Sequence, residues 1–297
     1  MKKEYLLRSL LFVPGHRENL MQSAIRSNSD AVLLDLEDSV QPKENKKLAR
    51  ELVKKYIQEG VFEGKYIFPR VNDRESGELL KDVYELTLEG IEGFMYPKSK
   101  SAKDIYFFSK LLETIEYEKG YEIGTFKIIP LIETASAVLK AEEIAGASTR
   151  VIGIAFGSED FVSDLKGIHD KEHQSIFTPR SIIAMAARAK NVIPIDTVHI
   201  NVHDLEDLET NLVLSKKLGY EGMLSLHPKE LDLIHEHYSP SSLEVENAQL
   251  TLKYAEEARK DNKGVAVING KFIGPPIILK AQEVLRKHNM IQRKKDN

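Results

Sequence analysis

The sequence predicts an α/β protein built as a (β/α)8 TIM barrel with a C-terminal helical extension. Short apolar runs alternate with longer charged segments of helical period, and eight such pairs fit within about 235 residues. The apolar runs are rich in Val, Ile and Leu with little alternation, as in parallel strands buried on both faces. No G-x-G-x-x-G motif follows the first run, which argues against an open dinucleotide-binding sheet.

Each predicted strand is a short apolar run followed by polar residues. The strands cover residues 6–13, 31–36, 66–71, 93–96, 127–132, 151–156, 192–200 and 222–226. Each predicted helix mixes charged residues with apolar ones spaced three and four apart. The helices cover residues 19–27, 43–58, 77–88, 102–118, 135–145, 179–190, 205–218 and 229–235.

The pattern changes after residue 238. A Ser-Pro-Ser-Ser break at 239–242 precedes a charged helix at 243–260, a β-like stretch at 263–272 and a helix at 276–287. A piece of this size is too small for a robust core of its own. We therefore predict a catalytic barrel domain at residues 1–238 and an extension at 239–297 that packs on the barrel or on a neighbouring subunit.

Composition excludes several classes of protein. Lys plus Arg number 42 and Asp plus Glu 46, so the net charge of −4 gives no reason to expect nucleic-acid binding. Cysteine is absent, which excludes disulfides, thiolate metal sites and a Cys nucleophile. No segment approaches the roughly 18 apolar residues of a membrane span. We expect a cytoplasmic protein that uses neither a membrane nor a nucleic acid.

Charged side chains recur where the predicted strands end. In an α/β barrel these ends form one functional rim. The ends carry Asp35-Leu-Glu37-Asp38, Arg70, Lys98, Glu133, Glu159-Asp160, Asn201 and His227-Pro228. Carboxylates without cysteine suit Mg²⁺ or Mn²⁺ better than Zn²⁺, and an arginine beside them suits a substrate carboxylate. The rim therefore predicts a metal-assisted site for an acid.

Taken singly, most of these residues have simpler interpretations. Asp38 fits a helix cap or a turn, and His227 fits the start of a helix. Arg70 and Lys98 fit surface ion pairs. Glu133 is harder to dismiss, because a carboxylate at the tip of an apolar strand is costly. Their joint placement on the strand ends favours a functional site.

Seven ordered motifs carry a family likeness. They are Arg8-Ser-Leu-Leu-Phe-Val-Pro-Gly15, Asp35-Leu-Glu-Asp-Ser-Val40, Pro69-Arg-Val-Asn72, Tyr96-Pro-Lys-Ser99, Pro130-Leu-Ile-Glu-Thr-Ala135, Phe156-Gly-Ser-Glu-Asp-Phe161 and His227-Pro228. Nearly the whole chain resembles the citrate lyase β-subunit-like group, with malyl-CoA and citramalyl-CoA lyases, of the HpcH/HpaI aldolase superfamily.

The resemblance implies a Mg²⁺-dependent carbon–carbon lyase. Its substrate would be a 3-hydroxy-acyl thioester of CoA or an acyl carrier that bears a carboxylate, cleaved into a keto acid and an acyl thioester. It also implies a homotrimer or homohexamer, or a subunit of a larger lyase complex.

The resemblance assigns roles to particular residues. Glu133 and Asp160 match the metal ligands, and Arg70 matches the arginine that binds the substrate carboxylate. Glu37, with Asp38 beside it, matches the catalytic carboxylate motif. The remaining expected substrate-binding residues are Arg8, Phe12, Pro14, Gly15 and Lys98.

Two departures from the family pattern leave other functions open. Relatives carry a proton-transferring Asp in a C-terminal G-x-x-x-D-x-P segment, and Gly274 stands in its place here. Asn201 stands where many relatives have Asp. The alternatives are a free-acid aldolase that releases pyruvate or oxaloacetate, and a low-activity paralogue that binds Mg²⁺ and a keto acid.

Overall fold

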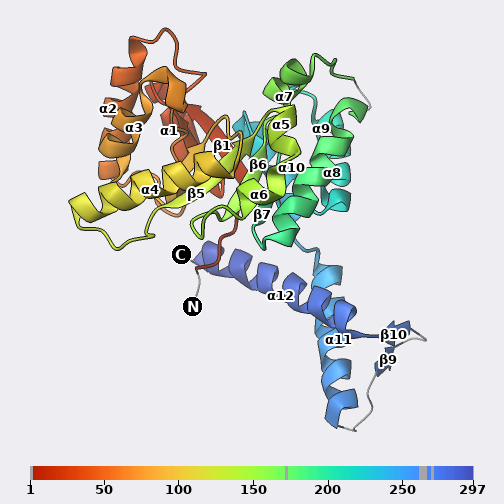
Figure 1. Cartoon of the computed structure of the whole chain (residues 1–297). Coiled ribbons are helices and arrows are strands. Elements are labelled where there is room, and N and C mark those ends of the chain that lie inside the picture. The colour runs from red at the N-terminus through yellow and green to blue at the C-terminus, as the bar shows by residue number, and fades with distance from the viewer. Residues whose placement is uncertain (1–2, 171–172, 261–265, 269–270, 297) are drawn as a thin grey trace. The chain divides into compact units, whose positions relative to one another are not determined.

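The structure is a computed structural model that describes residues 3–170, 173–260, 266–268 and 271–296 (Figure 1). The chain divides into two compact units. The barrel unit is Leu7–Ile234, and the second unit combines Met1–Leu6 with His235–Asn297. The domain boundary after residue 238 stays a prediction.

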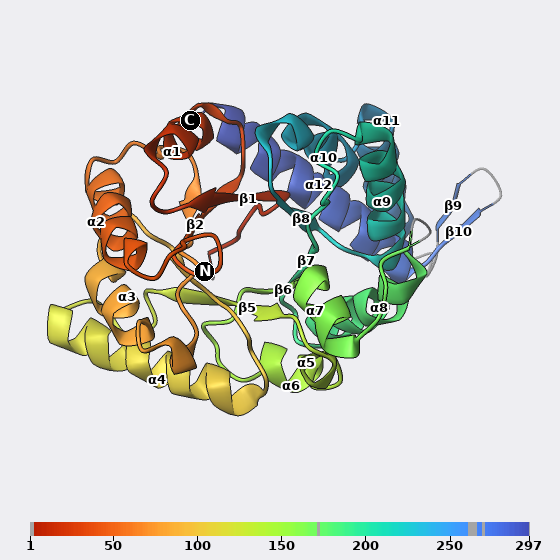
Figure 2. The same ribbon diagram turned by 90° about the horizontal axis from the view of Figure 1, so that it is seen from above.

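Eight parallel strands form the barrel unit and confirm the predicted fold class. They are β1 (Ser9–Pro14), β2 (Ala31–Asp35), β3 (Tyr66–Ile67), β4 (Gly93–Tyr96), β5 (Lys127–Ile132), β6 (Gly153–Phe156), β7 (Ile193–Asp196) and β8 (Gly222–Ser225). Their order is β3-β2-β1-β8-β7-β6-β5-β4, and a bridge between Arg70 and Met95 joins the two edges. The strands therefore surround a common axis, with helices outside them (Figure 2).

The helices of the barrel unit follow the strands in turn. They are α1 (Glu18–Arg26), α2 (Asn45–Gln58), α3 (Leu79–Leu86), α4 (Ala102–Lys119), α5 (Ala135–Val138), α6 (Ala141–Ala145), α7 (Ser158–Leu165), α8 (Gln174–Ala189), α9 (Leu205–Leu218) and α10 (Leu231–Tyr238), which ends beyond the unit. Two 3-10 turns, η1 (Arg74–Ser76) and η2 (Pro228–Glu230), precede α3 and α10.

The helices differ from the predictions in three places. Helix α7 lies between the predicted strand at 151–156 and the predicted helix at 179–190, where no helix is predicted, although Glu159 and Asp160 in its first turn favour a helix N-terminus. Pro179 was read as the start of a helix but lies inside α8, which begins at Gln174. The single helix expected at 135–145 is interrupted between α5 and α6.

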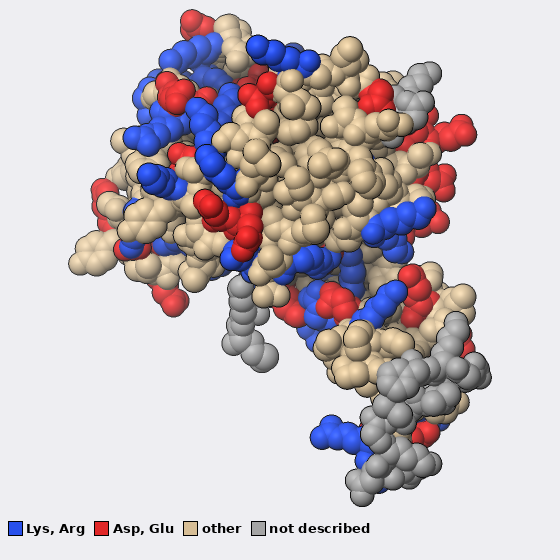
Figure 3. All heavy atoms as spheres, turned by 45° about the vertical axis from the view of Figure 1, so that its right-hand side comes forward, with Lys and Arg blue, Asp and Glu red and all other residues tan. Residues whose placement is uncertain are grey.

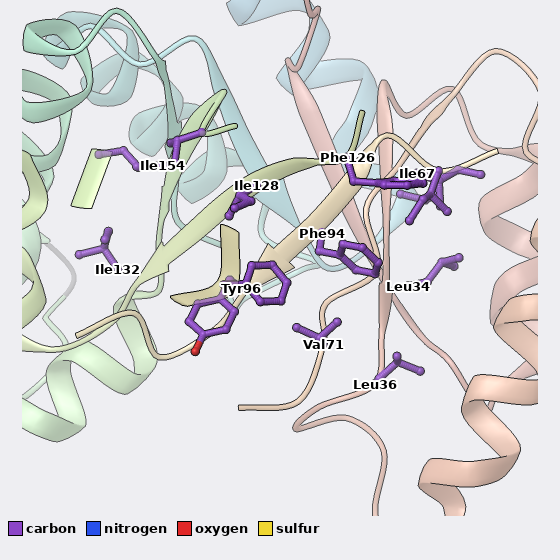
Figure 4. Packing of buried hydrophobic residues seen from close by; sticks show 14 of the residues in the cluster. Leu34, Leu36, Ile67, Val71, Phe94, Tyr96, Phe126, Ile128, Ile132 and Ile154 are labelled. Carbon is purple, nitrogen blue, oxygen red and sulfur yellow. The ribbon is translucent and has the colours of Figure 1, made fainter. Parts of the chain in front are cut away.

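The core lies between the strands and the surrounding helices. Figure 4 shows side chains from β2, β3, β4, β5 and β6 converging there. Phe94, Phe108 and Phe126 are buried, and the rings of Phe94 and Phe108 meet edge to face at 6.1 Å. Such packing holds the strands rigidly and so fixes the side chains at their ends.

The second unit contains α11 (Ser242–Lys260), α12 (Pro275–Asp296) and a two-stranded antiparallel sheet of β9 (Ala266–Ile268) and β10 (Lys271–Ile273). Within the β-like stretch predicted at 263–272, residues 263–265 and 269–270 lie outside the described residues. Ser241 caps α11, because its hydroxyl accepts from Glu244 N while Glu244 accepts from Ser241 N.

No helix in the described part of the chain is long and apolar enough to cross a membrane. On the face that Figure 3 shows, acidic and basic side chains lie next to one another in several places.

Candidate active site

A cavity of about 400 Å³ opens at the carboxyl ends of the barrel strands. Five of the predicted site residues line this cavity: Phe12, Pro14, Arg70, Glu133 and Asp160. Its other walls are largely apolar and include Leu11, Leu131, Phe156, Val198 and Leu224. A mostly apolar cleft with a few convergent charged groups is typical of a small-molecule site.

Arg70 is held in place from three sides. Its Nε and Nη2 atoms donate to the two carboxylate oxygens of Asp35 at 2.6 and 2.7 Å. The ring of Phe12 lies 4.8 Å from the guanidinium carbon, and Glu37 lies 3.3 Å from Nη1. The arginine side chain is only 11% exposed, so its interpretation as a surface ion-pair residue does not hold.

Asp35 and Arg70 each shift the pKa of the other toward the charged form. Burial opposes ionisation of Asp35, but the Arg70 guanidinium outweighs it and lowers the pKa of Asp35 to about 2. Burial likewise disfavours the charged form of Arg70, and Asp35 reverses the effect and raises the pKa of the guanidinium. Arginine has five N–H donors and Asp35 takes two of them, which leaves donors for a substrate carboxylate.

Lys98 contacts two acidic residues of the site, Glu37 and Glu133. Its Nζ lies 2.8 Å from Glu37 Oε1, and its backbone N–H donates to Glu133 Oε1. Lys98 has a φ of +48°, a strained conformation that brings both groups into contact with their carboxylates. Neither Lys98 nor Glu37 lines this cavity, and Lys98 lines a separate one together with Asp73 and Tyr96.

Glu133 lies directly after β5 and is 2% exposed. Burial, followed by the nearby charges of Glu37 and Asp160, raises the pKa of Glu133 to about 8. Burial is also the main cause that raises the pKa of Glu37 to about 7. Gly157 permits the close approach, since a Cβ there would lie 3.0 Å from the Cβ of Glu133.

The donor atoms for a metal in this cavity are carboxylate oxygens. Asp160 is exposed in the first turn of α7 and lines the same cavity as Glu133. The described residues contain no ready cluster of three or more Asp, Glu, His or Cys ligands. A metal bound by Glu133 and Asp160 would therefore take further ligands from water or substrate, which is the ordinary manner of Mg²⁺.

A buried network at the end of β7 positions the start of α7. Thr197 Oγ1 accepts from Ser158 N at 3.1 Å and donates to Ser158 Oγ at 2.7 Å. Thr197 N in turn donates to Asp196, which forms a fully buried ion pair with Arg180. Asp160 thus extends from a helix whose first residue is tied to the next strand.

Three predicted residues lie elsewhere. Arg8 precedes β1, and its Nε and Nη2 donate to Asp30 at 2.8 Å, away from the cavity. Gly15 does not line the cavity either, and a Cβ there would lie 2.8 Å from the carbonyl oxygen of Asp35, so its small size serves packing. Asp38 is half exposed and lies 3.6 Å from Arg70 at the edge of the charged cluster.

Asp35 and His227 are among the cavity-lining residues that the predicted set lacked. Both lie at strand ends, so the strand-end rule pointed to them. The sequence did not tell which of Asp35, Glu37 and Asp38 turns toward Arg70. The helix-starting interpretation of His227 was correct, because its side chain caps η2.

The family model described as HpcH/HpaI aldolase/citrate lyase matches residues 8–228. The chain belongs to this family. A citrate lyase subunit beta from Haemophilus influenzae is 34% identical over 282 residues, which cover 95% of this chain and 97% of that protein. An L-malyl-CoA/beta-methylmalyl-CoA lyase from Rhodobacter capsulatus is 28% identical, and the match covers 96% of this chain and 95% of that protein.

Among solved structures, the citrate lyase beta subunit of Mycobacterium tuberculosis complexed with oxaloacetate and magnesium is 25% identical. Its TM-score is 0.67, with 79% of this chain and 99% of that chain covered. A member of the HpcH/HpaI aldolase/citrate lyase family with these relatives is a carbon–carbon lyase.

Proposed function

We propose that this family member is a Mg²⁺-dependent lyase that cleaves a 3-hydroxy-acyl thioester bearing a carboxylate. The products are a keto acid and an acyl thioester. One observation carries the proposal: Arg70 lines the same cavity as the carboxylates Glu133 and Asp160. A fixed cation and an all-oxygen metal site together suit a substrate with a carboxylate beside a hydroxyl or keto oxygen.

Glu133 and Asp160 are the residues that would hold Mg²⁺. Burial and then the nearby carboxylates of Glu37 and Asp160 raise the pKa of Glu133, and a bound cation would offset both effects, so the residues present fit the metal. When bound, Mg²⁺ supplies a Lewis acid that polarises the hydroxyl or keto oxygen of the substrate. The magnesium and oxaloacetate in the Mycobacterium tuberculosis relative support this assignment.

Arg70 binds the substrate carboxylate through the N–H groups that Asp35 leaves free. The contacts from Asp35 and Phe12 fix the plane of the guanidinium before substrate arrives. Lys98 links the side chains of Glu37 and Glu133, because its Nζ contacts Glu37 and its backbone N–H donates to the Glu133 carboxylate. The apolar walls exclude water from the acyl half of the substrate.

We further propose a cytoplasmic homotrimer or homohexamer acting on a CoA or acyl-carrier thioester, alone or within a larger lyase complex. One relative is named as a subunit of citrate lyase, which supports a larger complex, and the other as a lyase of CoA esters, which supports a CoA thioester. Light scattering tests the oligomer, and a monomer would contradict it.

Calorimetry tests the site directly. We expect pyruvate, oxaloacetate or glyoxylate to bind wild type with Mg²⁺ and not with EDTA. Glu133→Gln should abolish this binding. The matched control is Glu159→Gln, which removes a neighbouring carboxylate of the same cavity lining that pairs with His169. Binding of none of the three acids, or equal loss in both variants, contradicts the proposed site.

Turnover then identifies the carrier. We expect cleavage of malyl-CoA, citramalyl-CoA or citryl-CoA rather than of the free hydroxy acids. Cleavage of the free acids alone would favour an aldolase. Binding of keto acid without any turnover would favour the low-activity paralogue suggested by Gly274, which has no side chain to move a proton.

A further inference from the structure

His227 lines the cavity but has no part in the function proposed above. It lies two residues after β8, and its ring caps the turn η2. Nδ1 of the ring accepts a hydrogen bond from the backbone N–H of Lys229 at 3.1 Å. A peptide N–H can only donate, so Nδ1 carries no proton and the ring proton lies on Nε2.

The backbone of His227 is also fixed. Glu230 Oε2 accepts from His227 N at 3.2 Å, from Leu226 N at 3.1 Å and from Ser225 Oγ at 2.7 Å. Within the described part of the chain, no acceptor lies within hydrogen-bond distance of His227 Nε2, whereas Nδ1 is satisfied. The ring is therefore a rigid, neutral group with one N–H donor left for a ligand of the cavity.

We propose that His227 donates this hydrogen bond to the carbonyl oxygen of the substrate thioester. The inference rests on the proposed lyase function and extends it to the acyl half. When the C2–C3 bond breaks, its electron pair moves onto the thioester carbonyl oxygen as an enolate, where a preoriented donor stabilises the charge. The C3 hydroxyl loses its proton to solvent and becomes the ketone, and the enolate takes a proton from solvent at C2.

His227 keeps its own proton throughout this step. The Lys229 N–H occupies Nδ1, so the ring has no free lone pair with which to take a proton from the substrate. A neutral imidazole of this kind acts as an electrophile rather than as a proton carrier. The role is therefore separate from the proton transfer for which Gly274 has no side chain.

Two substitutions of His227 separate its hydrogen-bond donor at Nε2 from its capping acceptor at Nδ1. His227→Asn places an amide oxygen where Nδ1 lies, so it keeps the cap and loses the Nε2 donor. His227→Gln places an amide N–H where Nε2 lies, so it keeps the donor and loses the cap. We expect the Asn variant to unfold at the wild-type temperature and to lose on the order of 100-fold in kcat, with pyruvate and glyoxylate binding unchanged. We expect the Gln variant to unfold at a lower temperature but to retain more activity than Asn.

The assays are malyl-CoA and citramalyl-CoA cleavage, and exchange of the acetyl-CoA methyl protons with D₂O, which reports enolate formation alone. Wild-type activity in the Asn variant, or greater loss in Gln than in Asn, overturns the donor role while leaving the lyase function in place. Absence of turnover and exchange in wild type overturns both. Nitrogen-15 spectra of histidine-labelled protein give a test without turnover: a protonated Nδ1 at His227 would overturn the assignment.

Discussion

Replacing Asp35 by Asn tests whether Arg70 depends on its carboxylate partner. The amide keeps the shape of the side chain but removes its charge, and leaves the buried guanidinium with Glu37 and the half-exposed Asp38 as its remaining carboxylate neighbours. We expect the variant to be less stable than wild type and to bind keto acids more weakly. Both effects have the same cause, since the pair that stabilises the fold also orients the substrate-binding group.

The size of the effect follows from the pKa of Asp35. Although burial opposes ionisation, Arg70 lowers this pKa from 3.8 to about 2, and at about 1.4 kcal/mol per unit the shift corresponds to about 2 kcal/mol. Because Glu37 still lies 3.3 Å from Arg70, the cost stays below the about 3–5 kcal/mol that follows when a buried charge loses its sole partner. Because the folded-state pKa is lowered, this stabilisation is present above about pH 4 and is lost as the pH falls toward 2.

Urea unfolding followed by circular dichroism measures the stability, and calorimetry with Mg²⁺ measures keto-acid affinity. The matched control is Asp30→Asn, which breaks the equally buried pair with Arg8 away from the cavity. We expect both variants to lose stability, and only Asp35→Asn to lose affinity, by about 10-fold or more. Equal loss of affinity in the two variants, or wild-type affinity in Asp35→Asn, would refute the reasoning.

Three further predictions concern other parts of the molecule. Without divalent cations, wild type should lose stability as the pH rises from about 4.5 to about 8, because the folded-state pKa of Glu133 is raised; Glu133→Gln should remove this loss in urea titrations. Gly274→Asp should raise the rate of malyl-CoA cleavage by supplying a general acid, on the order of 100-fold, and an unchanged rate would show that the proton comes from another source. Burial lowers the pKa of His199, but Glu230 and Asp207 outweigh it and raise the pKa above 6.5, so its stabilisation is complete below pH 6.5 and is lost at higher pH. The difference in free energy of unfolding between wild type and His199→Asn should therefore shrink as the pH rises above 6.5. A difference that stays constant would contradict this expectation.

The arrangement of the rim was predictable because it follows from the topology alone. Once eight apolar runs are parallel strands, their polar ends must meet at one end of the barrel. Arg70, Glu133 and Asp160 line one cavity for this reason, although they come from three separate strand ends.

Side-chain direction after a strand end was not predictable. Side chains alternate along a strand, and beyond its last residue the chain path depends on tertiary contacts. Asp35 closes β2 and faces Arg70, whereas Asp38, three residues on, is half exposed. The left-handed conformation of Lys98 is likewise imposed by contacts with Glu37 and Glu133 that no local pattern encodes.

Arg8 shows where family likeness and topology disagreed. The likeness placed it at the substrate, but it precedes β1 and therefore lies at the opposite end of that strand from Pro14. Its partner Asp30 likewise precedes β2, so the pair closes the amino ends of neighbouring strands. The expectation that site residues follow the carboxyl ends of the strands placed Arg8 correctly outside the cavity, because it derives from geometry that every parallel barrel shares.

The charge balance of the site gives an independent reason for a divalent cation. Asp35 and Glu37 are buried beside Arg70 and Lys98, two carboxylates with two cations. The cavity lining adds Glu133, Glu159 and Asp160, of which Glu159 lies 3.1 Å from His169, and the described residues of the lining include no Lys or Arg besides Arg70. Burial first, and then the charges of Glu37 and Asp160, raise the pKa of Glu133, whereas the lowered pKa of Asp35 shows that Arg70 already pairs with another carboxylate. Two missing positive charges beside two oxygen ligands are what one Mg²⁺ supplies.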